Sequence, residues 1–137
     1  MNDLKYNDEQ IRGMLKGINN IAVVGLSKNP YAVSYGVAKY LQQNGYRIIP
    51  VNPNADEVLG EKCYPNLDSI PESVELVNVF RREDALPAVI QEALEQKVPA
   101  IWLQLGLECA EGAAAAEKQK VLLIQDRCLR REHQRLL

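Results

Sequence analysis

Apolar residues follow two different patterns along this chain. Short runs of consecutive apolar residues, such as IAVV and VLLI, predict strands that are buried on both faces. Between these runs, apolar residues recur every three or four positions, which is the spacing of one face of an α-helix. The predicted strands lie at residues 21–24, 46–51, 75–80, 100–105 and 121–125.

The helical pattern is clearest near the start of the chain. Apolar residues at i, i+3, i+4 and i+7 predict a helix over residues 7–18, and Asn7 or Asp8 can cap it. Gly45 supplies the left-handed residue that ends a second helix, which starts near residue 33. Further helices are predicted at residues 84–96 and 108–118, whereas 52–71 reads as a polar connection and 129–137 as a basic segment.

Strands that alternate with helices indicate a parallel sheet, because two parallel strands need a crossover connection between them. We therefore expect an α/β protein with a Rossmann-like, doubly wound parallel sheet of five strands and helices on both faces. The expected strand order is 3-2-1-4-5, which puts the ligand crevice at the switch point between the first and fourth strands. At 137 residues, the chain is expected to form a single domain over residues 1–137.

Composition narrows the class of protein. Hydrophobic residues make up 47% of the chain and charged residues 25%, as in ordinary soluble globular proteins. The net charge of −2 creates no field that would attract nucleic acid, so a phosphate site has to be a local cluster of groups. No apolar stretch is long enough to cross a bilayer and the N-terminus lacks a leader pattern, so we expect no membrane contact and a cytoplasmic location.

Metal and disulfide chemistry do not fit the sequence. The cysteines Cys63, Cys109 and Cys128 are odd in number and widely spaced, no CxxC pair is present, and His133 is the single histidine. A zinc site or a disulfide framework needs closely spaced or evenly numbered ligands. We therefore expect no metal and treat the cysteines as packing or surface thiols.

The loop after the first predicted strand has the composition of an anion site. Gly25 ends the strand, Ser27 and Lys28 follow in a polar loop, and Ser34 lies at the start of the next helix. The first N–H groups of a helix have no intrahelical acceptor, and its dipole favours negative charge there. The alternative is that Gly25 and Pro30 only shape a tight turn and that Ser34 caps the helix.

Known nucleotide motifs are absent from this loop. A dinucleotide fingerprint requires G-x-G-x-x-G and an acidic residue at the end of the second strand, but residues 25–30 read GLSKNP and the second strand ends in VNP. A P-loop requires Lys followed by Ser or Thr, whereas Lys28 is followed by Asn29. NAD binding and ATP hydrolysis are therefore not expected.

Polar groups also follow the other predicted strands. They are Asn52 and Asn54 after the second strand, Arg81 and Arg82 after the third, and Gln104 and Gly106 at the fourth. Such a set suits a nucleotide with more than one phosphate cluster. The alternative for the two arginines is a solvated pair that is balanced by Glu83 and Asp84.

These blocks together carry a family resemblance. The segments VVGLSKNP, VNP, VFRR and WLQLG, followed by DRC with Glu132 and His133, resemble the small stand-alone CoA-binding proteins in order and spacing. Those proteins are similar to the CoA-binding N-terminal domain of the succinyl-CoA synthetase α subunit. The resemblance covers nearly the whole chain from about residue 10, and five ordered blocks are more specific than any one of them.

The resemblance implies that the chain binds coenzyme A or an acyl-CoA. The loop at Gly25, Ser27 and Lys28, with the helix start at Ser34 and Tyr35, would hold the phosphates. The adenosine end and the pantetheine arm would lie against the loops after the other strands. The residues implied there are Asn52, Pro53, Phe80, Arg81, Arg82, Gln104 and Gly106.

No catalytic group is expected in this chain. His133 lies beside Glu132 without a recognisable nucleophile, so it reads as a packing or surface residue, and Cys128 reads as a buried thiol although a CoA thiol could reach a strand end. The synthetase reaction also needs a phosphohistidine in a second domain. The leading interpretation is therefore a binding module, and the alternative is a component of an acyl-CoA ligase or thioesterase that acts with a partner chain.

Overall fold

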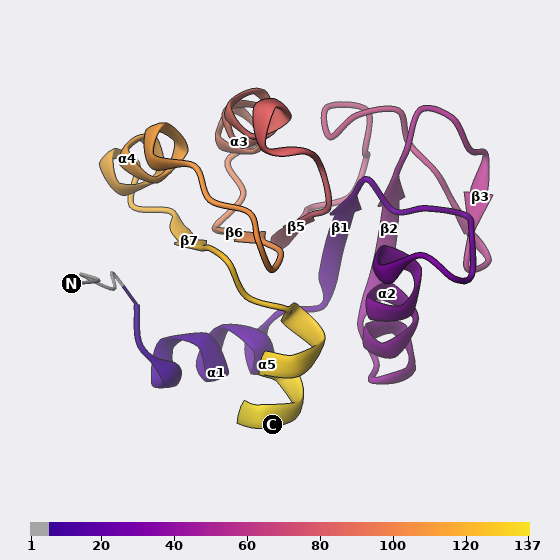
Figure 1. Ribbon diagram of the computed structural model, residues 1–137, viewed down its shortest axis with the longest axis horizontal. Helices are drawn as coiled ribbons and strands as arrows, with labels where there is room; N and C mark the ends of the chain where they lie inside the picture. Colours follow the sequence, from indigo (N-terminus) through magenta and orange to yellow (C-terminus); the bar gives the residue numbers. More distant parts are fainter. Residues whose placement is uncertain (1–5) are drawn as a thin grey trace.

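The computed structural model describes residues 6–137, which fold around a five-stranded parallel sheet (Figure 1). Neighbouring strands pair in the order β2-β1-β5-β6-β7. All pairs within this sheet are parallel, as the near-continuous apolar runs predicted. The strands are β1 (Asn20–Val24), β2 (Arg47–Val51), β5 (Leu76–Val79), β6 (Ala100–Leu103) and β7 (Leu122–Ile124).

Helices cover both faces of the sheet, which confirms the expected α/β architecture (Figure 1). One face packs against α1 (Asp8–Gly17), α2 (Val33–Gln43) and α5 (Leu129–Leu136). The other face packs against α3 (Leu86–Glu95), which follows a short 3-10 turn, η1 (Glu83–Ala85), and against α4 (Ala110–Lys118). Alternate side chains of each strand therefore enter two separate cores.

The capping residues predicted from the sequence lie at the observed ends of α1 and α2. Asn7 caps α1 through a capping box, in which its side chain accepts the Gln10 N–H and its own N–H donates to the Gln10 side chain, both at 2.9 Å. Gly45 follows α2 with a φ of +94°, as the left-handed end of that helix predicted. No helix within residues 6–137 has the length and apolar character to cross a membrane.

The strand order differs from the expected 3-2-1-4-5. The third strand of the parallel sheet, β5, pairs with β1 instead of lying beyond β2, so the order in chain sequence is 2-1-3-4-5. The outer edge of β2 is already occupied, because Tyr64 donates its N–H to Pro50 at 3.0 Å and accepts the Asn52 N–H at 2.9 Å. The switch point therefore lies between β1 and β5, and the ligand crevice is expected between their two loops.

Two segments without a predicted element have regular structure. The polar connection contains a small antiparallel pair, β3 (Glu57–Val58) and β4 (Glu61–Lys62), beside β2. The basic C-terminal segment forms α5, whose buried face consists of Leu129, His133 and Leu136. The arginines at positions 130, 131 and 135 are exposed, whereas Glu132 is largely shielded beside Arg127, so this helix is amphipathic.

Candidate functional site

The β1 loop and the end of β5 approach each other closely at the switch point, where the topology predicts the ligand crevice. Gly25 has a φ of +85°, and a Cβ on this residue would lie 2.1 Å from the carbonyl oxygen of Phe80. The Gly25 N–H donates to Val51 at 2.9 Å, and the Phe80 N–H donates to Val24 at 2.8 Å. These bonds hold Gly25 between the ends of β2 and β5, where no side chain fits.

Hydrogen bonds within the chain hold the β1 loop in one shape. Ser34 is buried, and its hydroxyl oxygen accepts the Ser27 N–H at 3.0 Å. Ser27 in turn accepts the Asn29 N–H at 3.0 Å. The N-cap residue of α2 is Ala32, which makes no side-chain cap bond, so the alternative that Ser34 caps the helix is wrong. Ser34 instead ties the helix to the loop in front of it.

The start of α2 offers unpaired backbone donors beside this loop. Gly36 makes the first intrahelical bond, to Ala32 at 3.2 Å. The N–H groups of Val33, Ser34 and Tyr35 precede it and have no acceptor among residues 6–137, as at other helix starts. Lys28 is exposed in the loop and makes no ion pair within this part of the chain. The arrangement is positive and open to an anion.

Asn52 joins the loops of β1 and β2. Its side-chain nitrogen donates to the Leu26 carbonyl at 2.9 Å, and its side-chain oxygen accepts the Asn54 N–H at 2.8 Å. Both ends of the amide are therefore engaged with the fold, and Asn52 positions the crevice wall. Pro53 follows on the exposed rim.

Two arginines follow β5 on the other side of Gly25. The Arg81 side chain crosses the glycine, since its Cδ lies 3.2 Å from where a Gly25 Cβ would be. Arg82 Nε lies 3.7 Å from Asp84 Oδ1, and both side chains are largely exposed, so this contact contributes little to stability. Phe80 is half-buried between the arginines and the core. Both arginines are exposed beside the β1 loop.

Gln104 and Gly106 shape the loop after β6. The Gln104 side-chain oxygen accepts the Leu129 N–H at 3.2 Å and the Asn78 amide at 3.3 Å, so this buried residue links β5, β6 and the start of α5. Gly106 has a φ of +88°, and its N–H donates to Asp126 at 2.7 Å. Both residues lie at the crevice end of the sheet, but the Gln104 oxygen is already engaged.

Sequence reasoning missed Asn78 and three exposed apolar residues. Asn78 is fully buried within β5, and its side-chain oxygen has no hydrogen-bond partner among the described residues. Its signal was a polar residue in the otherwise apolar run LVNV. Tyr31 in the β1 loop, Val33 at the first position of α2 and Leu105 after β6 are 95%, 71% and 58% exposed. Their signal was apolar character next to polar loop residues.

His133 has a packing role, as predicted. It is buried, its Nδ1 lies 2.6 Å from the Tyr40 hydroxyl, and its ring meets those of Tyr40 and Tyr46 edge-on at 5.3 and 5.6 Å between centroids. Burial lowers the pKa of His133, because the charged imidazolium loses its hydration there. His133 therefore connects α5 to α2 through its contact with Tyr40.

The cysteines are also integrated in the fold. Burial raises the pKa of Cys63. Cys109 is buried, and its sulfur accepts the Gly112 N–H at 3.3 Å at the start of α4. Cys128 is half-buried and precedes α5. Within residues 6–137, no group of three or more His, Cys, Asp or Glu residues is arranged to hold a metal ion.

Comparison with known proteins identifies relatives of nearly the whole chain. The CoA binding domain family matches residues 19–134. The uncharacterized protein YneT of Bacillus subtilis (strain 168) is 41% identical over 124 residues, which cover 90% of this chain and 92% of YneT. A hypothetical protein from Pyrococcus horikoshii OT3 superposes with a TM-score of 0.94 at 34% identity, covering 99% of this chain and 96% of its own.

A larger relative contains a similar region. ADP-forming acetate–CoA ligase II of Archaeoglobus fulgidus is 30% identical over 106 residues, which are 76% of this chain but only 16% of the ligase. The chain thus spans about a sixth of that enzyme's length. The match over residues 19–134 includes every strand of the sheet and each loop that borders the crevice. The chain therefore belongs to the CoA binding domain family.

Proposed function

We propose that this chain binds coenzyme A or an acyl-CoA in the crevice between the β1 and β5 loops, without chemistry of its own. The observation that carries the proposal is the constrained loop at residues 25–32, which presents the start of α2 beside Gly25. Family membership supplies the identity of the ligand. The loop supplies a place where its phosphates can bind.

The diphosphate of CoA would lie against the N–H groups at the start of α2. Those donors already face outward, so binding costs little reorganisation. Lys28 would add a mobile charge on one side, and the guanidinium of Arg81 or Arg82 would meet the 3′-phosphate or the diphosphate on the other. Three cations around a crevice suit a ligand that carries two separate phosphate groups.

The rest of the ligand would follow the neighbouring loops. Asn52 and Pro53 border the side of β2, and Gly106 borders the side of β6. Tyr31, Val33 and Leu105 expose apolar surface on the same edge of the sheet. Such surface is suited to the adenine ring and to the methyl groups of the pantetheine arm, because burial of apolar area favours binding.

Titration calorimetry with CoA, 3′-dephospho-CoA and NAD tests this proposal. We expect CoA to bind most tightly, 3′-dephospho-CoA to bind less tightly because it lacks a phosphate near the arginines, and NAD to bind weakly or not at all. Saturation by NAD in preference to CoA would overturn the proposal. Equal affinity for CoA and 3′-dephospho-CoA would show that the arginines do not contact the 3′-phosphate.

A second candidate function is that of a ligase component. It is favoured by the match to a limited part of ADP-forming acetate–CoA ligase II, whose remaining length has no counterpart here. A partner chain would then supply the chemistry. Turnover of acyl-CoA by the purified chain, or its co-purification with a nucleotide-binding ligase subunit, would favour this function over simple binding.

A further inference from the structure

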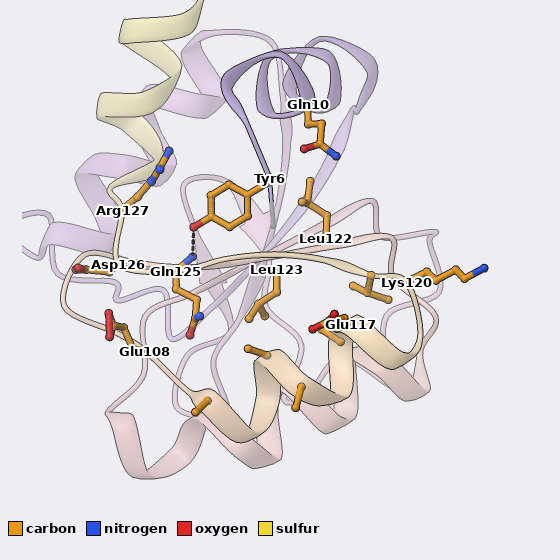
Figure 2. A pocket seen from close by; sticks show the side chains of 15 residues that line it. Tyr6, Gln10, Glu108, Glu117, Lys120, Leu122, Leu123, Gln125, Asp126 and Arg127 are labelled. Carbon is orange, nitrogen blue, oxygen red and sulfur yellow. Dashed lines mark hydrogen bonds between the residues drawn. The ribbon is translucent and has the colours of Figure 1, made fainter. Parts of the chain in front are cut away.

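Within residues 6–137, β7 is an edge strand of the sheet with no further strand paired to it, on the side away from the β1 and β5 loops. β7 is the last strand of the sheet, and a groove of about 800 Å³ runs along it. Figure 2 shows Tyr6 and Gln10 above the strand, α4 below it and Lys120 at one end. A strand edge with this much open space beside it is a template for pairing with another strand.

The backbone of β7 directs hydrogen-bonding groups into this groove. The Leu122 N–H donates to Pro99 at 3.2 Å, toward the β6 side. Because backbone groups alternate along a strand, the N–H and C=O of Leu123 point the opposite way, out of the sheet. The Gln125 N–H also points outward and donates to the Tyr6 hydroxyl at 3.4 Å, a contact that pairing with a second strand would replace. The N–H and C=O of Leu123 have no such partner among residues 6–137.

The segment that can pair has a centre of symmetry. Lys120 and Asp126 have φ values of +59° and +56°, so extended backbone is confined to the residues between them. Leu123 is the midpoint of this segment and of β7 itself. We propose that a second copy of the chain pairs with β7 in antiparallel fashion about a two-fold axis at Leu123, which joins the two sheets into one.

This register is self-complementary. It places Leu123 opposite its own copy, where the two outward backbone groups can form a reciprocal pair of hydrogen bonds, and it brings the Gln125 N–H opposite the Val121 carbonyl. It also places Lys120 of each copy opposite Asp126 of the other. Both of these residues are exposed and line the groove, and Asp126 also accepts the Gly106 N–H at 2.7 Å. In the dimer, the two opposite charges would therefore lie near each other twice.

The neighbouring helix leaves room for the second copy. Four alanines of α4 line the groove, and Glu117 near the end of the helix is a longer side chain that also lines it. In the proposed dimer, the two α4 helices would lie on the same face of the joined sheet, on either side of the axis. Short side chains allow helices to approach closely, whereas long ones here would hold the strands apart.

Sedimentation equilibrium of the full chain tests the proposal. We expect a monomer–dimer equilibrium, and we expect Lys120→Glu to weaken dimerisation by about tenfold or more, because it creates two like-charge contacts with Asp126. Lys97→Glu is a matched control. Lys97 is also exposed and left-handed, with a φ of +58°, but it precedes the interior strand β6. It should leave dimerisation unchanged.

A second variant separates charge from misfolding. Adding Asp126→Asn to Lys120→Glu removes the repulsion and keeps an oxygen for the Gly106 N–H, so dimerisation should partly recover. A chain that stays monomeric at millimolar concentration would overturn the proposal. Equal effects of Lys97→Glu and Lys120→Glu would also overturn it, as would dimerisation only after removal of residues 1–5, since that segment would then be the occupant of the edge.

Discussion

Replacement of Gly25 by alanine tests the geometry on which the proposed CoA site depends. The new Cβ would lie 2.1 Å from the Phe80 carbonyl oxygen, a backbone atom that cannot rotate away. The backbone of residue 25 would also have to keep a φ of +85° with a side chain attached. The variant therefore combines left-handed strain with a clash between the ends of β1 and β5.

The two effects have separate magnitudes. Left-handed backbone costs a residue with a Cβ about 1–2 kcal/mol, and forcing extra volume into a packed contact costs about 1–3 kcal/mol. We expect Gly25→Ala to lower the free energy of unfolding by roughly 2–5 kcal/mol. For a chain of this length, Tm should fall by about 7–17 °C. CoA affinity should fall as well, because relief of the clash moves the phosphate loop.

Gly60→Ala provides the matched control. Gly60 has a φ of +77°, but a Cβ there would have no atom within 4 Å. This variant should lose only the left-handed term of about 1–2 kcal/mol and should bind CoA like the parent. Thermal unfolding by circular dichroism and calorimetric titration with CoA measure both effects. If the two variants lose equal stability, or if Gly25→Ala binds CoA normally, the proposed close packing of the β1 and β5 loops is not what shapes the site.

Three further predictions concern single side chains. Lys28→Ala should weaken CoA binding by about 1.5–3 kcal/mol, or tenfold to a hundredfold, with Tm unchanged; parental affinity at low salt would show that the diphosphate binds elsewhere. The depressed pKa of His133 means that the unfolded chain binds a proton more readily, so stability should be full above the ordinary pKa of 6.5 and should fall as pH drops below it. Urea unfolding between pH 7.5 and 5 measures this slope, and His133→Gln should flatten it; an unchanged slope would assign it to other groups. Gly112→Ala would place a Cβ 2.3 Å from the Ile90 side chain. It should lower the free energy of unfolding by about 1–3 kcal/mol in urea without changing CoA affinity, and an unchanged urea midpoint would show that Ile90 moves aside freely.

Most of the secondary structure could be predicted from the sequence, because the signals for helices and strands are local. Continuous apolar runs marked the parallel strands, a spacing of three and four marked the helices, and Asn7 and Gly45 marked helix ends through their own capping chemistry. The family resemblance could be recognised as well, because the sequence segments that carry it are contiguous and occur in a fixed order. Gly25 is predictable as a turn residue from its place at the end of a strand, whereas its contact with Phe80 is not.

Relations between distant segments were decided only by the tertiary structure. The strand order depended on Tyr64, which occupies the outer edge of β2 and leaves β1 as the partner for β5. One alternative in the sequence was that Ser34 only caps its own helix. In the structure, the Ser34 hydroxyl oxygen instead accepts the Ser27 N–H, because the loop folds back over the helix start. Periodicity describes which face of an element is buried and not which element covers it, so such pairings follow from packing across the whole chain.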